Sequence, residues 1–217
     1  MAKKIPYGLT DYFRIVTEDF YYVDKTKYIE DLEKTAAFLF LIRPRRFGKS
    51  LFLNMLNCYY DVKYADRFEE LFGNQYIGNH PTAEQGKYLV LRFNFSMVRA
   101  TDDKLEAAFN RHISLETAYF ASVYASYFKP DFQEQLKLIP EAAGRLEYIC
   151  LCAKEQGLSI YLLIDEYDNF TNTILSSKGN DVYHSLTHDS GFYRSFFYVV
   201  KGVTTGAEAP VKRMFIT

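Results

Sequence analysis

The segment that most constrains the fold of this chain is an apolar run that leads through a short basic loop into a helix-like stretch. Five consecutive apolar residues, Phe38–Ile42, suit a strand buried on both faces of a sheet. After the loop, apolar residues from Phe52 to Tyr59 recur at the spacing i, i+3, i+4 and i+7, which predicts a helix over Ser50–Tyr60. A strand, a loop and a helix in this order are the unit from which α/β folds are built.

The remainder of the chain repeats this alternation. The region between Tyr60 and Lys87 shows no clear pattern. Further strands are predicted at Tyr88–Phe95, Ile160–Ile164 and Arg213–Thr217, and further helices at Lys27–Lys34, Asp103–Phe120, Arg145–Glu155 and Val182–Val200. The alternation predicts a three-layer α/β fold with a mostly parallel central sheet. Because 217 residues can bury one substantial core and no repeat or linker interrupts them, we expect a single domain over residues 1–217.

The loop Ile42–Ser50, IRPRRFGKS, carries most of a phosphate-binding pattern. Its last three residues, Gly48–Ser50, end the pattern G-x-x-x-x-G-K-[ST], in which Arg43 here replaces the first glycine. Pro44 fixes its own φ angle and biases Arg43 toward extended backbone. The phosphate-binding amides come from the later residues. The replacement therefore changes how the chain enters the loop, and phosphate binding is still expected.

In a loop of this kind, successive backbone N–H groups at a helix N-terminus surround the β-phosphate. Gly48 lets the main chain approach the phosphate, Lys49 places its ammonium between the β- and γ-phosphates, and the Ser50 hydroxyl completes the shell of a Mg²⁺ ion. The residues expected to hold the nucleotide are Arg45, Arg46, Phe47, Gly48, Lys49, Ser50 and Leu51. For the three arginines, a solvated basic turn and a contact with phosphate or a partner are equal alternatives.

Acidic residues follow a second apolar run, Ile160–Ile164, which ends at Asp165 and Glu166. A nucleotidase needs one carboxylate to hold Mg²⁺ through water and a second to orient the attacking water, and Asp165 and Glu166 suit these roles in turn. An isolated acidic pair is more often a loop or a helix cap. Its combination with the earlier Gly-Lys-Ser loop favours a nucleotide site. Thr217, at the tip of the last strand, is a candidate sensor of the γ-phosphate and the water, with an ordinary chain end as the alternative.

Composition excludes several other classes of protein. The formal net charge is −1, so no global field would hold a polyanion, and nucleic-acid binding by this domain has no support in the charge. Cys58, Cys150 and Cys152 are too few for a disulfide framework or a zinc site and suit packed thiols in a reducing compartment. His184 and His188 lack the glutamate of a H-E-x-x-H metal motif. Without a signal-peptide core or an apolar run of ~18 residues, we expect a soluble cytoplasmic protein with no membrane contact.

With these residues in view, the chain resembles a bacterial family of predicted AAA-ATPase-like proteins. The matching stretches occur in the same order along nearly the whole chain: Pro6–Gly8 (PYG), Tyr22–Ile29 (YVDKTKYI), Leu41–Leu56 (LIRPRRFGKSLFLNML), Leu162–Asp168 (LLIDEYD) and Arg213–Thr217 (RMFIT). RPRRFGKS is close to a signature of that family, so the resemblance makes Arg43 the expected residue. The resemblance implies a P-loop NTPase fold of the AAA/ATPase type.

The resemblance also implies which residues form the nucleotide site. Lys49, Ser50, Asp165 and Glu166 would form its centre, and the segment Tyr22–Thr26, including Asp24, would lie beside the nucleotide. From its chemistry alone, Tyr22 suits stacking on adenine and core packing equally. Members of the family commonly carry a C-terminal nuclease-like domain of the PD-(D/E)XK type, so we expect this chain to be a fragment that lacks a lid and that domain.

The leading hypothesis is Mg²⁺-dependent binding and hydrolysis of ATP. Lys49 and the loop amides would hold the phosphates, Ser50 and Asp165 the metal, and Glu166 the water. A first alternative is a nucleotide-binding switch with little turnover that controls an attached nuclease-like effector domain. A second is a non-catalytic interaction scaffold, against which the intact set of Lys, Ser, Asp and Glu argues. The work that ATP drives, and whether the chain forms a homo-oligomer, stay open at the level of sequence.

Overall fold

The computed structural model describes residues 3–44, 46–98, 104–178, 180–187 and 191–217. Its centre is a four-stranded sheet in which every described pair of neighbouring strands is parallel, in the order β1-β4-β3-β2. The strands are β1 (Phe38–Phe40), β2 (Leu89–Asn94), β3 (Ile160–Asp165) and β4 (Val211–Ile216). The α/β class and the parallel sheet are therefore confirmed.

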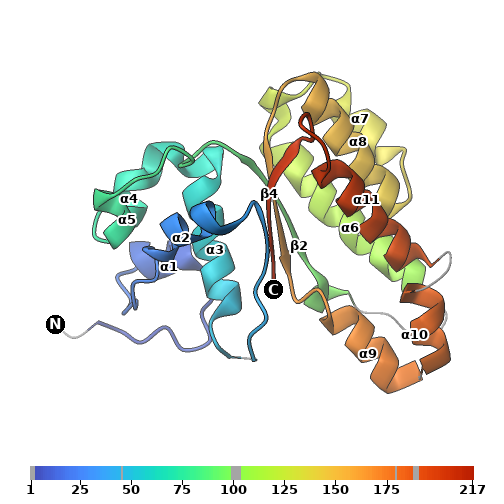
Figure 1. The fold of residues 1–217 in the computed structure, drawn as a ribbon, viewed down its shortest axis with the longest axis horizontal. Coiled ribbons are helices and arrows are strands. Elements are labelled where there is room, and N and C mark those ends of the chain that lie inside the picture. Colours follow the sequence, from blue (N-terminus) through green and yellow to red (C-terminus); the bar gives the residue numbers. More distant parts are fainter. Residues whose placement is uncertain (1–2, 45, 99–103, 179, 188–190) are drawn as a thin grey trace.

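Helices lie on both sides of this sheet (Figure 1). One side carries α1 (Tyr12–Thr17), α2 (Tyr28–Thr35), α3 (Lys49–Tyr60), α4 (Phe68–Phe72) and α5 (Tyr76–Asn79), with the 3₁₀ helix η1 (Val62–Arg67) between α3 and α4. The other side carries α6 (Leu105–Val123), α7 (Phe132–Lys137), α8 (Ala142–Glu155), α9 (Asn169–Lys178), α10 (Asn180–Thr187) and α11 (Phe192–Thr204). Two short 3₁₀ turns, η2 (Phe95–Met97) and η3 (Ala125–Tyr127), follow β2 and α6.

Side-chain alternation along the strands divides the core into two clusters. Leu162 and Ile164 of β3 face the cluster beneath α6, α8 and α11, whereas Tyr161 and Leu163 face the cluster beneath α1 and α3. Because both faces of β3 are covered, its residues are uniformly apolar up to Asp165. This strand matches its sequence prediction.

Several predicted elements agree with the structure closely. α2 and α3 begin and end within one residue of the predicted helices. α8 buries the predicted face and is followed by Gly157, whose φ of 66° is the left-handed conformation that favours glycine after a helix. The three cysteines are free thiols, and burial raises the pKa of Cys58 to about 12.

Two predictions are wrong. The run Phe38–Ile42 does not form a strand buried on both faces: Phe38 is 40% exposed and Ile42 is 81% exposed. β1 is an edge strand of the described sheet and pairs only with β4, and an apolar run alone does not specify how many neighbours a strand has. The single helix predicted at Val182–Val200 is two helices, α10 and α11, and Gly191, the residue before α11, has non-helical backbone (φ −59°, ψ 140°).

The sequence patterns also missed some elements. Periodicity did not predict α1, α7 or α9, and the unassigned region between Tyr60 and Lys87 contains η1, α4 and α5. Most of these helices have six residues or fewer, too short for a helical period to show. Asp103, the predicted start of the helix that forms α6, lies outside the described residues.

Candidate nucleotide site at the carboxyl edge of the sheet

The strand order brings the predicted site residues to one edge of the sheet. In the register of the strands, Phe40 of β1 lies opposite Ile216 of β4, which in turn lies opposite Ile164 of β3. The loop after β1 leads to α3 on one face, whereas the segments after β2 and β3 lead to helices on the other face. Connections that leave in opposite directions open a crevice at the carboxyl ends of parallel strands, where ligands commonly bind.

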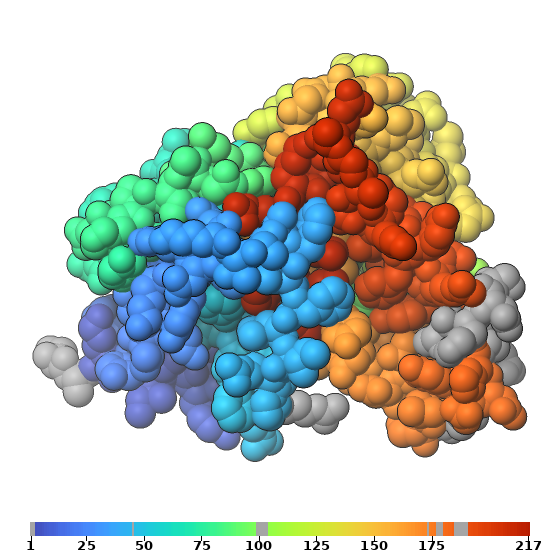
Figure 2. Space-filling model, viewed as in Figure 1, coloured from blue at the N-terminus to red at the C-terminus, as the bar shows by residue number. Residues whose placement is uncertain are grey.

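The loop before α3 has the backbone of an anion nest. Arg46 has a φ of 68° and Gly48 a φ of 79°, while Phe47 between them is not in the positive-φ region, and backbone that alternates in this way is typical of anion-binding nests. Gly48 is the residue before the first turn of α3, whose first N–H groups have no partner within the helix. In the space-filling view, the light blue atoms of this part of the chain lie on the surface at the front (Figure 2). Arg45 lies outside the described residues.

Lys49 folds back over this loop. Its Nζ donates a hydrogen bond of 3.1 Å to the backbone carbonyl of Arg43, at the start of the loop. Arg43 and Arg46 are exposed, and Phe47 is 62% exposed. Leu51 and Ser50 lie in the first turn of α3 and are half-buried. Of the sequence-predicted loop residues, Phe47, Gly48 and Lys49 line one pocket together with Arg43, whereas Arg46, Ser50 and Leu51 do not line it.

Asp165 and Thr217 meet at the tips of β3 and β4. The Thr217 hydroxyl donates a hydrogen bond of 2.6 Å to Oδ1 of Asp165, whose side chain is 1% exposed. Backbone hydrogen bonds from Thr217 N–H to Ile164 C=O (2.9 Å) and from Tyr167 N–H to Thr217 C=O (3.1 Å) hold this contact in place. Both residues are predicted site residues, and local sequence patterns do not indicate that they pair.

Glu166 has a backbone conformation that non-glycine residues rarely adopt. Its φ is 55°, in the left-handed region. A non-glycine residue in that region carries a cost on the order of 1 kcal/mol, and such strain concentrates at functional sites. The turn at Glu166 leads directly to Tyr167, whose N–H bonds to the carbonyl of Thr217.

A pocket of about 570 Å³ lies between α2 and the loop, lined in part by Lys25, Tyr28, Leu39, Arg43 and Lys49. A Cβ atom built on Gly48 would lie 3.7 Å from the ammonium of Lys25, so this lysine reaches the loop. Neither Lys25 nor Tyr28 was predicted as a site residue, although Lys25 belongs to the segment Tyr22–Thr26 that the family resemblance placed beside the nucleotide, and Tyr28 follows that segment closely. Only the folding of α2 against the loop reveals them.

Tyr22 and Asp24, the two residues that sequence analysis named in that segment, have structural partners elsewhere. The ring of Tyr22 packs edge-on against Tyr12 with centroids 5.1 Å apart, and burial raises the pKa of its hydroxyl. Asp24 accepts hydrogen bonds of 2.7 Å from Thr26 and from the backbone N–H of Tyr76, which joins the segment to α5. A contact of Tyr22 or Asp24 with a nucleotide stays a prediction.

The donor atoms at this edge fit a magnesium ion. Mg²⁺ takes oxygen ligands and is commonly held by one or two protein groups together with substrate phosphates. Asp165 and Ser50 supply a carboxylate and a hydroxyl. Within the described ranges, no group of three or more His, Cys, Asp or Glu side chains is placed to bind a metal by itself. His184 belongs to no such cluster, and His188 lies outside the described residues.

A parallel α/β sheet with a glycine-containing loop leading into a helix at its carboxyl edge is typical of proteins that bind phosphate groups. The chain belongs to the family described as Predicted AAA-ATPase, whose sequence profile matches residues 6–217. This confirms the family resemblance on which the sequence analysis relied.

The chain is also similar to one curated relative. This is an "Uncharacterized protein in vnfD 5'region" of Azotobacter chroococcum mcd 1, which is 49% identical over 55 residues. The aligned segment spans 25% of this chain and 11% of that relative. No solved structure matches the chain. Among the residues that the structure describes, no helix is both long and apolar enough to cross a bilayer.

Proposed function

We propose that this chain is the nucleotide-binding domain of an ATPase that binds ATP with Mg²⁺ and hydrolyses it, in a three-layer P-loop NTPase fold. The observation that carries the proposal is the convergence of two features at one sheet edge. These are the nest-like loop that ends in Gly48, and the buried Asp165 bonded to Thr217. Family membership supports a nucleotide-binding role.

Each residue of this edge has a distinct task in the proposed reaction. The loop amides and Lys49 bind the β- and γ-phosphates. To do so, Lys49 replaces its hydrogen bond to the Arg43 carbonyl with a contact to phosphate. Ser50 and Asp165 hold Mg²⁺, which neutralises charge on the phosphates when it is bound. Glu166 orients the attacking water and accepts its proton. Thr217, whose hydroxyl is hydrogen-bonded to Asp165, senses the γ-phosphate.

The pocket between α2 and the loop suits the base of the nucleotide. Its lining is mostly apolar and includes the ring of Tyr28 beside the charged Lys25 and Asp31. The ammonium of Lys27 lies over one face of this ring, 5.2 Å from its centroid, so a base would stack on the other face. In this proposal, α2 recognises the base, next to the segment Tyr22–Thr26 that the family resemblance had indicated. Tyr28→Ala is therefore expected to weaken ATP binding more than it weakens binding of inorganic triphosphate.

The experiment that tests the proposal is a calorimetric titration of ATP with Mg²⁺ into the purified chain. Lys49→Ala is expected to weaken binding by about 100-fold or more, because it removes a charge-assisted contact to phosphate. Lys201→Ala, an exposed lysine of α11, is the matched control and is expected to bind like the wild type. Absence of ATP binding by the wild-type chain, and by a longer chain that continues beyond Thr217, would refute the proposal in favour of a scaffold.

Hydrolysis is tested separately from binding. Glu166→Gln is expected to bind ATP with unchanged affinity and to slow single-turnover hydrolysis by about 10²- to 10⁴-fold, the usual contribution of a general base. If the wild type binds ATP tightly but its single-turnover rate equals that of Glu166→Gln, the chain is a nucleotide-dependent switch with little turnover.

A further inference from the structure

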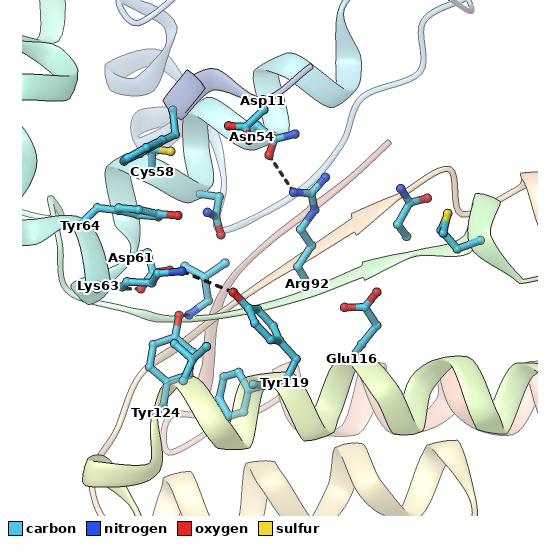
Figure 3. A pocket seen from close by; sticks show the side chains of 17 residues that line it. Asp11, Asn54, Cys58, Asp61, Lys63, Tyr64, Arg92, Glu116, Tyr119 and Tyr124 are labelled. Atoms are coloured by element: carbon cyan, nitrogen blue, oxygen red, sulfur yellow. Dashed lines mark hydrogen bonds between the residues drawn. The ribbon is translucent and has the colours of Figure 1, made fainter. Parts of the chain in front are cut away.

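A second pocket, of about 350 Å³, lies at the free edge of β2 between α3 and α6 (Figure 3). Its lining is mainly polar and includes Asn54 and Asn57 from α3 and Glu116 from α6. Arg92 rises from β2 through this pocket toward Asn54 (Figure 3). The side chain of Arg92 therefore links β2, the neighbour of β3, to α3, the helix that follows the phosphate loop.

Three contacts connect the two predicted metal ligands through these side chains. Asn54 Nδ2 donates a hydrogen bond of 2.8 Å to the carbonyl of Ser50, one helical turn earlier. Arg92 Nη1 donates a hydrogen bond of 2.8 Å to Asn54 Oδ1. The other terminal nitrogen of the guanidinium, Nη2, lies 3.9 Å from Oδ2 of Asp165.

The carboxylate of Asp165 thus has a different partner for each oxygen. Oδ1 accepts a hydrogen bond from Thr217, and Oδ2 faces Arg92, so each carboxylate oxygen of this buried side chain has a neighbouring group. The amide of Asn54 is defined in the same way, because its nitrogen is engaged with Ser50 and its oxygen with Arg92. A guanidinium can serve two partners at once because its N–H groups form a rigid planar fork.

We propose that Arg92 and Asn54 are positioning residues, which hold Ser50 on α3 and Asp165 on β3 at the separation that Mg²⁺ requires. The inference rests on the proposed function, since it concerns the same metal site. Mg²⁺ demands near-ideal octahedral geometry, so a small displacement of either ligand weakens its binding. Asp165 lies on β3, whereas Ser50 lies on α3, which follows β1, and β4 lies between these two strands. The side-chain connection through Arg92 and Asn54 therefore links two elements that are not neighbours in the sheet.

A simpler role for Arg92 would be that of a counter-charge for the buried Asp165. The two roles differ in their dependence on Asn54, which is neutral and does not contact Asp165. Asn54→Leu removes the connection to α3 while the arginine keeps its charge. Arg92→Lys keeps the charge but loses the fork that reaches both partners.

Calorimetry measures the ATP affinity of each variant in EDTA and at a series of Mg²⁺ concentrations. The quantity compared is the Mg²⁺ concentration at which half of the Mg²⁺-dependent gain in ATP affinity is reached. Asn54→Leu and Arg92→Lys are each expected to raise this concentration about tenfold, the equivalent of one hydrogen bond to a charged group, with metal-free ATP affinity within about twofold of wild type. The double variant is expected to match the single variants, because residues of one connection are not additive. Asn57→Leu, on the same helix and in the same pocket, is the matched control and is expected to behave like wild type.

Each other outcome has a defined meaning. If Asn54→Leu leaves the half-saturating Mg²⁺ concentration unchanged, Arg92 acts at most as a counter-charge and the positioning role is overturned. An equal shift in Asn57→Leu, or additive effects in the double variant, would overturn it as well. If the wild type binds ATP identically with and without Mg²⁺, or binds no ATP, the proposed function itself fails. Circular dichroism in urea establishes whether each variant is folded. If Arg92→Lys is unfolded, the result for Asn54→Leu alone decides whether the positioning role holds.

Discussion

The two faces of the sheet differ in which aromatic residue predominates. The face covered by α1–α5 buries mainly tyrosines: Tyr12, Tyr59, Tyr60, Tyr88 and Tyr161, with Phe72 and Phe215. The face covered by α6–α11 buries mainly phenylalanines: Phe93, Phe95, Phe109, Phe120, Phe128, Phe132, Phe170 and Phe196, with Tyr124 and Tyr193. The tyrosine face is the one that contains α3, the helix after the phosphate loop.

Hydrogen bonds distinguish the tyrosine face. The hydroxyl of Tyr12 donates to the carbonyl of Leu71 (2.9 Å), and that of Tyr60 donates to the carboxylate of Glu33 (3.0 Å). A buried hydroxyl without a partner is costly, so each of these rings has one favourable orientation. These two hydroxyls therefore fix α1 against α4 and α3 against α2, as well as burying apolar surface.

Ring packing distinguishes the phenylalanine face. Phe109 contacts Phe196 with centroids 5.3 Å apart and Phe95 with centroids 5.5 Å apart, and Phe128 stacks on Phe132 at 4.0 Å. Such contacts depend on shape and volume, and they carry no charge or hydrogen bond. Tyr124 and Tyr193 on this face also have hydrogen-bond partners, and rings pack on the tyrosine face as well, so the difference is one of degree. The phenylalanine face relies mainly on packed rings, whereas the tyrosine face adds a side-chain hydrogen bond that holds α3, the helix beside the site, against α2.

The largest expected effect is a truncation on the phenylalanine face. Phe109→Ala is expected to lower the free energy of unfolding by about 3–5 kcal/mol, because the ring is fully buried among other rings and its loss leaves a cavity. Urea unfolding followed by circular dichroism measures the change. Leu138→Ala, at a side chain that is 75% exposed, is the control and should change stability by no more than about 0.5 kcal/mol. Equal effects of the two variants would contradict the comparison.

A pH effect is expected on the tyrosine face, at the end of α3. Burial raises the pKa of Asp61 to about 6, so the folded state binds a proton more tightly than the unfolded chain. Stability is therefore expected to fall as the pH rises from about 4 to about 6, by about 3 kcal/mol at most. Asp61→Asn should remove this dependence and be the more stable form at pH 7. Urea unfolding at a series of pH values measures it, and an identical slope in both proteins would refute the assignment.

The smallest expected effect concerns a single hydroxyl. Tyr60→Phe is expected to lower the free energy of unfolding by about 1 kcal/mol, because the carboxylate of Glu33 loses one donor while Thr82 still donates to it at 2.8 Å. Tyr198→Phe, at a side chain that is 75% exposed, is the matched control and should have no measurable effect. If both variants unfold alike, hydroxyl pairing does not separate the two faces.

Local patterns were sufficient to predict the elements that carry the site. The helical spacing after the loop predicted α3, the apolar run before Asp165 predicted β3, and the motif predicted where a phosphate would bind. These signals are local, because side-chain periodicity and glycine requirements act over a few residues. They failed at β1, whose exposure depends on its position in the sheet.

The residues that sequence analysis missed share one property, which is that their partners are distant in the chain. Arg92 and Asn54 are 38 positions apart, and each is an ordinary polar residue within its own element. Lys25 looks like one exposed lysine among several until α2 lies against the loop. No local pattern marks such residues, since their importance comes only from what the fold places beside them.

By itself, the sequence determined the alternation of strands and helices, the glycine that opens α3 and the carboxylates that end β3. The tertiary structure alone decided that β4, the last strand of the chain, lies between β1 and β3. That insertion brings Thr217 into hydrogen-bonding distance of Asp165 and places both beside the loop. The physical reason is that backbone and side-chain propensities select each element locally, whereas strand order depends on which faces all the elements must bury together.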